Sequence, residues 1–262
     1  MRPAAAAVSC IILLAAGGAT AAGTTADPAR EHDKCVADAE RDPQAGLARA
    51  KQWSSQGGGF DADHCAAMAL FGMKRYAEAA AAFDRLANGA TPASAGDRAR
   101  LFDQGGQAWL VADQPTQAKR DFDAAIANAP TDSDLYIDRA EALAATQKFW
   151  DAIDDLNHAS ELAPQKAEIY AYRAAAYRAV DSLDLAREDV ERNLKLAPDN
   201  PIGLLERGNI RRIAGDVAGA KQDWQDVVRR APGSASAAAA AQNLAHLGAT
   251  RDKPAPATKN KP

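Results

Sequence analysis

Apolar side chains recur along most of this chain at intervals of three and four residues, the spacing that one face of an α-helix requires. In the stretch 135–159 they form two such runs, separated by a polar break at 145–148. The strict alternation of apolar and polar residues that is typical of β-strands is absent from the pattern. The chain is therefore predicted to form pairs of amphipathic helices joined by short turns.

The predicted helix pairs repeat every 34 residues. Three registers show this period over four units: an aromatic residue or leucine, an alanine, and a proline. Their members are Phe102, Tyr136, Tyr170 and Leu204, then Ala118, Ala152, Ala186 and Ala220, and then Pro130, Pro164, Pro198 and Pro232. A fixed period of this length indicates a repeat array rather than one globular core.

A further register holds only small residues, namely Gly106, Ala140, Ala174 and Gly208. A small side chain at a helix crossing lets two backbones approach closely, and large neighbours such as Phe122 and Trp224 then fill the surrounding space. Each proline of the repeat ends its unit, because proline cannot continue a helix. Asp132 and Asp199, just past a proline, suit the start of the next helix.

These shared positions resemble those of the tetratricopeptide repeat (TPR) family. The resemblance implies an all-α fold, a right-handed α-solenoid of helix-turn-helix repeats with helical caps. An earlier unit, with Ala79 and Phe83 at family positions, lies 39 residues before the next one, so its loop carries five extra residues. The expected organisation is an N-terminal helical cap at 23–59, about five repeats over 60–233, a C-terminal capping helix at 234–248 and a disordered tail at 249–262.

Three units also carry an arginine and, sixteen residues later, an aspartate. The two registers fall on facing sides of the helix pair, which favours structural ion pairs; the alternative is an arginine ladder that binds anions. The second unit has Asp121 but Gly105 in the arginine position. The predicted pairs are Arg139 with Asp155, Arg173 with Asp189, and Arg207 with Asp223.

Residues 1–22 have the features of a secretory signal peptide of the bacterial type: Arg2, an apolar run at 8–16 and small residues up to Ala22. The apolar run is too short to span a bilayer, although an uncleaved anchor is the alternative. The mature chain is expected to be exported and periplasmic. Loss of Arg2 changes the formal net charge from −4 to −5, which argues against nucleic-acid binding.

Export changes the interpretation of the cysteines. Cys10 would leave with the signal peptide, and the remaining pair, Cys35 and Cys65, is expected to form a disulfide in an oxidising compartment. A metal site with His32 and His64 is the alternative. We predict no metal, because adjacent residues such as His64 and Cys65 point about 100° apart on a helix.

No motif for catalysis or cofactor binding stands out in the sequence. The four histidines form no motif with a serine or cysteine nucleophile, and the glycines at 57–59 lack the lysine of a phosphate-binding loop. The chain is therefore predicted to be no enzyme and to need no cofactor.

The resemblance instead implies a concave groove, lined by the first helix of each pair, that binds a protein or peptide. The positions in that register are Met68, Phe71, Asp134, Glu141, Glu168, Arg178, Asn209 and Arg212. From the first unit to the last, the side chains of this groove would change from apolar to acidic and then to a mixture that includes two arginines. Family members that clamp a chaperone's acidic C-terminus use lysines and asparagines there, and only Asn209 fits that pattern, so such a clamp is not expected.

The function that follows is a periplasmic protein-protein interaction scaffold, within an envelope complex. Two alternatives remain at this point. One is an accessory protein that binds a small molecule or glycan in a pocket near Phe71 and Trp109, and the other is a purely structural spacer.

Overall fold

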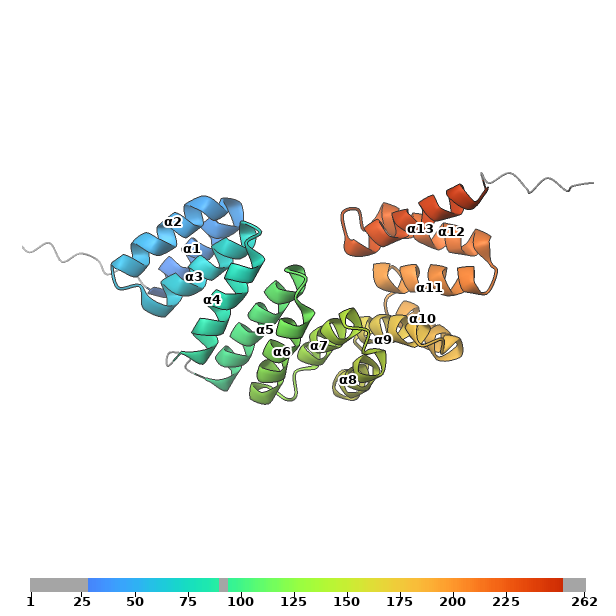
Figure 1. Cartoon of the computed structure of the whole chain (residues 1–262), viewed down its shortest axis with the longest axis horizontal. Helices are drawn as coiled ribbons and strands as arrows, with labels where there is room; N and C mark the ends of the chain where they lie inside the picture. Colours follow the sequence, from blue (N-terminus) through green and yellow to red (C-terminus); the bar gives the residue numbers. More distant parts are fainter. Residues whose placement is uncertain (1–27, 90–93, 252–262) are drawn as a thin grey trace, which may run out of the picture.

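The computed structural model describes residues 28–89 and 94–251, and these form thirteen α-helices without a strand (Figure 1). The predicted signal peptide and residues 252–262 of the predicted tail lie outside the described residues. The helices are α1 (Pro28–Arg41), α2 (Pro43–Ser55), α3 (Gly59–Gly72), α4 (Tyr76–Asn88), α5 (Ala95–Val111), α6 (Pro115–Asn128), α7 (Ser133–Ala145), α8 (Phe149–Leu162), α9 (Ala167–Ala179), α10 (Leu183–Leu196), α11 (Pro201–Ile213), α12 (Val217–Arg230) and α13 (Ala235–Arg251).

Five helix pairs, α3–α4 to α11–α12, follow one another along an arc, with α1 and α2 before them and α13 after them (Figure 1). We number these pairs as units 1 to 5. The second helix of each unit packs against the first helix of the next. The first helices of units 2 to 5 and α13 also contact one another in succession, as α1 contacts α3. These odd-numbered helices therefore line the inner side of the arc, and the predicted all-α solenoid is confirmed.

The turn inside each unit has the same backbone conformation. One residue adopts a left-handed φ between 59° and 88°, and the N–H of the next residue donates to the carbonyl five positions back, as in Lys148 N–H to Leu143 O at 2.9 Å. This arrangement closes the end of a helix by satisfying its last carbonyls. Glycine is the residue that tolerates this φ best, but only the last of the five is glycine. The five residues are Lys74, Asp113, Gln147, Asp181 and Gly215.

Residue sizes are matched where the two helices of a unit cross. A Cβ atom on Gly106 would lie 2.5 Å from the ring of Phe122, and one on Gly208 would lie 2.5 Å from the indole of Trp224. Glycine is therefore required opposite the two aromatic residues. Units 3 and 4 have alanine in this register, and the residue on the second helix is the smaller Leu156 or Val190. Each crossing is thus filled by one small and one complementary larger side chain.

In units 3 and 4 a tyrosine hydroxyl ties the first helix to the turn before it. Tyr136 Oη and Tyr170 Oη donate to the carbonyls of Pro130 and Pro164, both at 2.9 Å. Asp132 caps α7, as its position after the proline predicts. The corresponding expectation for Asp199 is wrong by one residue: Asn200 caps α11, accepting from the N–H groups of Ile202 and Gly203.

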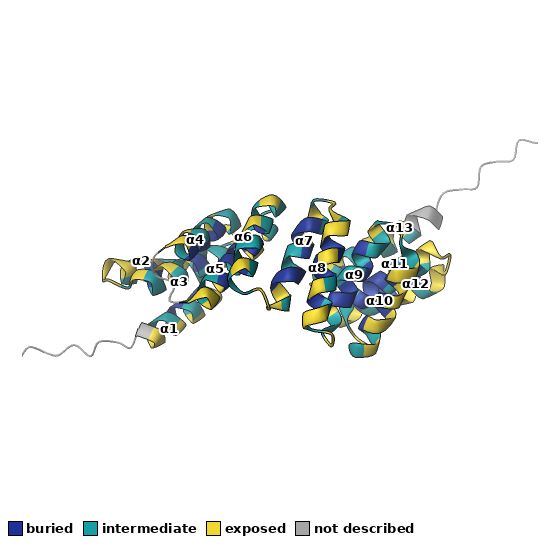
Figure 2. Ribbon diagram, turned by 90° about the horizontal axis from the view of Figure 1, so that it is seen from below, coloured by how far each residue is buried: buried dark blue, intermediate teal, exposed yellow. Residues whose placement is uncertain are grey.

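Buried residues recur on helices from one end of the described array to the other, and they form successive clusters between neighbouring helices rather than one central core (Figure 2). At its C-terminal end Leu244 and Leu247 of α13 pack against the buried residues of unit 5, so α13 covers the last apolar face of the array. Among the described helices, none combines the length and the apolar character that a membrane crossing would need.

Candidate protein-interaction groove

The arginine and aspartate registers meet in space. The guanidinium of Arg139 donates to both carboxylate oxygens of Asp155 at 2.8 and 2.7 Å, and Arg173 does the same to Asp189 at 2.8 Å. Each arginine also reaches back to the preceding unit, where Arg139 donates to Asp123 at 2.9 Å and Arg173 to Asn157 at 2.8 Å. The pKa of Arg139 is raised mainly by its hydrogen bonds with Asp155. These arginines join neighbouring units, so they are not free to form an anion ladder.

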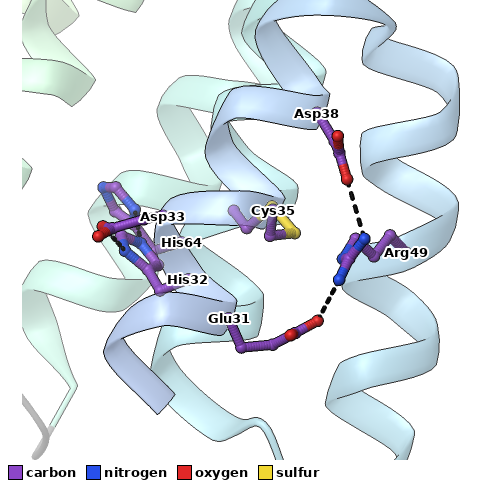
Figure 3. The surroundings of a disulfide bond; sticks show 8 residues. Glu31, His32, Asp33, Cys35, Asp38, Arg49 and His64 are labelled. Carbon is purple, nitrogen blue, oxygen red and sulfur yellow. Dashed lines mark hydrogen bonds and ion pairs between the residues drawn. A yellow bond between two sulfur atoms is a disulfide. The ribbon is translucent and has the colours of Figure 1, made fainter. Parts of the chain in front are cut away.

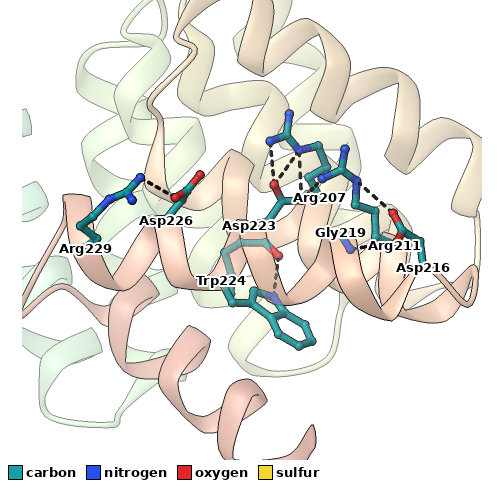
Figure 4. Close-up of polar contacts among 9 residues, drawn as sticks. Arg207, Arg211, Asp216, Gly219, Asp223, Trp224, Asp226 and Arg229 are labelled. Carbon is teal, nitrogen blue, oxygen red and sulfur yellow. Dashed lines mark hydrogen bonds and ion pairs between the residues drawn. The ribbon is translucent and has the colours of Figure 1, made fainter.

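In unit 5 the aspartate of the ion pair, Asp223, contacts two arginines instead of one (Figure 4). Arg207 and Arg211 both donate to Asp223, with shortest distances of 2.7 Å, and Asp223 is almost fully buried. Trp224, the next residue, donates from its indole to the carbonyl of Leu205 at 3.4 Å. Two cations around one buried carboxylate fix α12 against α11, and this second arginine lies outside the 34-residue register.

A disulfide joins Cys35 of α1 to Cys65 of α3, and both residues are fully buried (Figure 3). Arg49 of α2 forms ion pairs with Glu31 and with Asp38 of α1, the latter at 2.9 Å. The first three helices are therefore held together by one covalent link and one bridging arginine.

The histidines beside this disulfide hydrogen-bond to one another. His32 Nε2 lies 3.0 Å from His64 Nδ1, and His64 Nε2 lies 3.0 Å from Gln104 Oε1 of α5. Burial lowers the pKa of His64, which favours its neutral form. The described residues contain no cluster of three or more histidine, cysteine, aspartate or glutamate side chains that could hold a metal ion.

The inner surface at α5 and α7 carries a carboxylate pair. Gln107 Nε2 donates to Asp103 at 3.0 Å and to Asp138 at 3.4 Å, so the two carboxylates face the same amide. Burial, together with the nearby charge of Asp138, raises the pKa of Asp103 to about 8, and burial also raises the pKa of Asp138. One oxygen of Asp103 is buried without a hydrogen-bond partner in the structure. Negative charge is therefore only partly compensated at this point of the inner surface.

Next to the carboxylate pair lies an apolar pocket of about 370 Å³ between α7, α8 and α9. Its walls are mainly alanines with Phe149 and Leu156, and polar groups of Glu141, Tyr172 and Arg178 stand at its edge. Burial and then the charge of Asp138 raise the pKa of Glu141. Burial, with the charges of Glu141, Asp138 and Glu168, raises the pKa of Tyr172 to about 12. We call Asp103, Asp138, Glu141, Glu168 and this pocket the acidic groove.

The structure places the predicted groove residues in three different surroundings: against the core, exposed on the surface, and, for Arg178 and Asn209, in a polar network described below. Met68 and Phe71 are half-buried against the core of units 1 and 2, and Phe71 packs edge-on against Tyr76. Glu141, Glu168 and Arg212 are exposed, and the exposed Asp134 forms an ion pair with Lys166.

Arg178 and Asn209 belong to a polar network of their own. Arg178 forms an ion pair with the buried Glu206 at 2.5 Å, and Asn209 donates to the same carboxylate at 3.1 Å. Asn209 also accepts from Asn243 of α13 at 2.9 Å. These two side chains join units 4 and 5 to the C-terminal cap.

Sequence reasoning did not select Asp138, Tyr172 or Glu206. Asp138 and Tyr172 do lie on the first helix of their units, and their helical spacing to Glu141 and Glu168 was the signal that could have found them. Phe71 and Trp109 both pack, half-buried, against the core of units 1 and 2. A separate cavity of about 770 Å³ lies between α2, α3 and α4 and is lined by residues such as Leu47, Phe60 and Leu86.

Comparison with known proteins supports the fold. No protein-family model and no curated protein matches the chain. Among solved structures, a thermophilic TPR protein of Thermus thermophilus, TTC0263, is 18% identical with a TM-score of 0.56, over 68% of this chain and 95% of that one.

Two further structures give similar values. MamA of Desulfovibrio magneticus is 18% identical with a TM-score of 0.56, over 66% of this chain and 97% of its own. PilF of Pseudomonas aeruginosa is 17% identical with a TM-score of 0.54, over 74% and 86%. Together with the 34-residue period and the five helix pairs, these similarities show that the chain is a tetratricopeptide-repeat protein in fold.

Proposed function

We propose that the chain is an exported interaction scaffold, without catalytic activity, whose acidic groove binds a basic peptide segment of a protein partner in the cell envelope. The observation that carries the proposal is the apolar pocket between α7 and α9, which has the carboxylate of Glu141 in its lining and the charge of Asp138 acting on that carboxylate. An extended segment that placed one apolar side chain in the pocket and lysine or arginine beside it would match both features.

The charges of the groove explain why a basic ligand is favoured. Asp103 and Asp138 share the amide of Gln107, and partial burial is the main cause that raises the pKa of each carboxyl; the charge of Asp138 adds to the effect on Asp103. A lysine or arginine of the ligand would supply the missing positive charge. Binding is therefore expected to weaken with salt, since charge attraction near a surface is screened.

The disulfide supports the proposed location outside the cytoplasm. Cys35 and Cys65 form a bond that oxidising compartments favour, and the segment 1–22 has the features of a secretory signal peptide. Export is tested by fusing residues 1–22 to a reporter that is active only outside the cytoplasm. A fusion that stays inactive would refute this part of the proposal.

The interaction is tested by crosslinking the tagged protein in its native cells and identifying partners by mass spectrometry. The double variant Glu141→Lys with Glu168→Lys reverses the charge of the acidic groove on two exposed positions. The matched control, Asp154→Lys with Glu188→Lys, makes the same charge change on the exposed faces of α8 and α10. A partner lost with the groove variant and kept with the control supports the proposal; equal recovery with both variants refutes it.

A further inference from the structure

Unit 2 keeps the surroundings of a guanidinium but lacks the arginine. In unit 3 the guanidinium of Arg139 lies between Asp123 of α6 and Asp155 of α8, with its carbon 5.7 Å from the ring centre of Tyr136. Arg173 of unit 4 lies over Tyr170 in the same way, at 5.4 Å. The recurring parts are an acceptor on the second helix of the preceding unit, an aspartate on the second helix of the same unit, and an aromatic ring three residues before the arginine.

All three parts are present in unit 2. Asp84 of α4 and Asp121 of α6 hold the two acceptor positions, Phe102 holds the aromatic position, and Gly105 stands where the arginine would be. A Cβ atom on Gly105 would lie 2.9 Å from one oxygen of Asp121 and 2.9 Å from one oxygen of Asp84. Both carboxylates therefore turn towards the position of the missing side chain.

These carboxylates lack partners that units 3 and 4 provide. Asp121 is only 8% exposed, and the oxygens that face Gly105, Oδ2 of Asp121 and Oδ1 of Asp84, have no hydrogen-bond partner in the structure. The other oxygen of Asp84 accepts from Trp109 Nε1 at 3.3 Å. Buried acceptors without donors are costly, and two adjacent carboxylates add repulsion.

The electrostatics agree with this geometry. Burial and the neighbouring Asp84 raise the pKa of Asp121 to about 8, whereas the charge of Arg120 and a hydrogen bond from Trp109 act in the opposite direction. The position equivalent to Gly105 is partly open to solvent in units 3 and 4, where the side chains of Arg139 and Arg173 are 22% and 16% exposed. In unit 2 the buried Asp121 and the half-buried Asp84 fill this position, so a ligand that entered it would have to displace the two carboxylates from Gly105.

We infer that Asp84, Asp121 and Phe102 form a second binding site, which takes a guanidinium group supplied from outside the chain. A guanidinium fits better than an ammonium ion, because its planar donors can pair with two carboxylates at once while its face stacks on a ring. The source is either an arginine of a bound polypeptide or a free small guanidinium compound. The site is formed by α4, α5 and α6 and does not rest on the function proposed for the acidic groove.

The test follows the indole N–H of Trp109 by NMR, because this group donates to Asp84. The purified protein is titrated at millimolar concentrations with the blocked tripeptide Gly-Arg-Gly, its Gly-Lys-Gly counterpart, and methylguanidinium. We expect a saturable shift with the arginine peptide and at least tenfold weaker binding of the lysine peptide. Tighter binding of the peptide than of methylguanidinium identifies a polypeptide source, and equal affinity identifies a small compound.

Three variants make the result specific. Asp121→Asn and Asp84→Asn each remove one acceptor charge, and Gly105→Arg supplies the guanidinium within the chain; each is expected to weaken binding at least tenfold. Gly105→Arg is also expected to raise the melting temperature, while Asp154→Asn on the exposed face of α8 leaves binding unchanged. The inference is overturned by the absence of a saturable shift, by equal affinity for arginine and lysine peptides, or by binding that survives in Asp121→Asn and Asp84→Asn.

Discussion

The two ends of the array fix the spacing of their helices by different means. Units 3 to 5 repeat an arginine that pairs with an aspartate of its own unit, and in units 3 and 4 it also reaches the preceding one. The N-terminal helices have instead a disulfide between α1 and α3 and the bridging Arg49. Unit 2, between them, has neither the disulfide nor the arginine. The comparison shows that one repeat fold can be stabilised by a single covalent link or by a periodic ion pair.

The largest expected effect is loss of the covalent link. Changing both Cys35 and Cys65 to serine should lower the free energy of unfolding by about 3–4 kcal/mol, because the bond closes a loop of 30 residues in the unfolded chain. Fluorescence of Trp53, near the disulfide, and of Trp224 in unit 5, each kept as the single tryptophan, reports the two ends separately. Trp53 should report unfolding at lower denaturant than Trp224; coincident transitions shifted by the same amount would contradict a local role.

Breaking one periodic ion pair should cost slightly less. Arg173→Ala leaves the buried Asp189 without its partner, and we expect a loss of about 3 kcal/mol, measured by urea unfolding. The control is Arg187→Ala, because Arg187 pairs with Asp184 on the exposed surface of α10, where such pairs contribute less than about 1 kcal/mol. Equal losses in both variants would show that the buried register has no special role.

The carboxylate pair of the acidic groove predicts a pH dependence. The folded-state pKa of Asp103 is raised to about 8, above the ordinary value, so the folded protein holds a proton that the unfolded chain releases. Its contribution to stability is present at low pH and is lost as the pH rises towards 8. Asp103→Asn should therefore raise stability at pH 8 by on the order of 1 kcal/mol and change it little at pH 4. Parallel stability curves for the two proteins between these pH values would show that Asp103 is not the group responsible.

The smallest effect concerns a feature that both ends share. Lys74 and Asp181 hold the left-handed turn position of units 1 and 4, with φ of 61° in each case. Replacing either with glycine should stabilise the protein by about 0.5–1 kcal/mol, because glycine adopts this φ without steric cost. Thermal unfolding should show similar gains at both sites, and the reverse change, Gly215→Lys, should give a loss of similar size. A gain at only one end would mean that the two turns differ in context.

Local patterns allowed much of the fold to be predicted. The 34-residue period identified the helix pairs because their apolar faces and prolines lie within each unit, and the arginine and aspartate registers are sixteen residues apart in every occurrence. The signal peptide stays a prediction. The contact of Arg178 with Glu206 was not predictable in the same way, because the pair does not repeat: one period earlier the two positions hold Ala144 and Tyr172. Met68 was assigned to the groove from its register position, and in the structure its half-buried side chain also packs against the core of units 1 and 2.

The sequence alone also could not predict that Asp84 lies next to Asp121. The five extra residues of the first loop displace Asp84 from the 34-residue period, so its equivalence to Asp123 becomes clear only in the structure. The gap at Gly105, in contrast, was visible in the sequence.

The pattern of contacts along the arc has a consequence for how the chain folds. All the larger helix contacts join elements no more than two apart in order, so few long loops must close before native contacts form. Chains with such local topology fold quickly, and nucleation can begin in any unit and spread to its neighbours. The disulfide makes the N-terminal end the exception, since it joins α1 to α3 and can form only after these helices meet. In the exported chain proposed above, this bond would form only after the N-terminal helices reach the oxidising compartment.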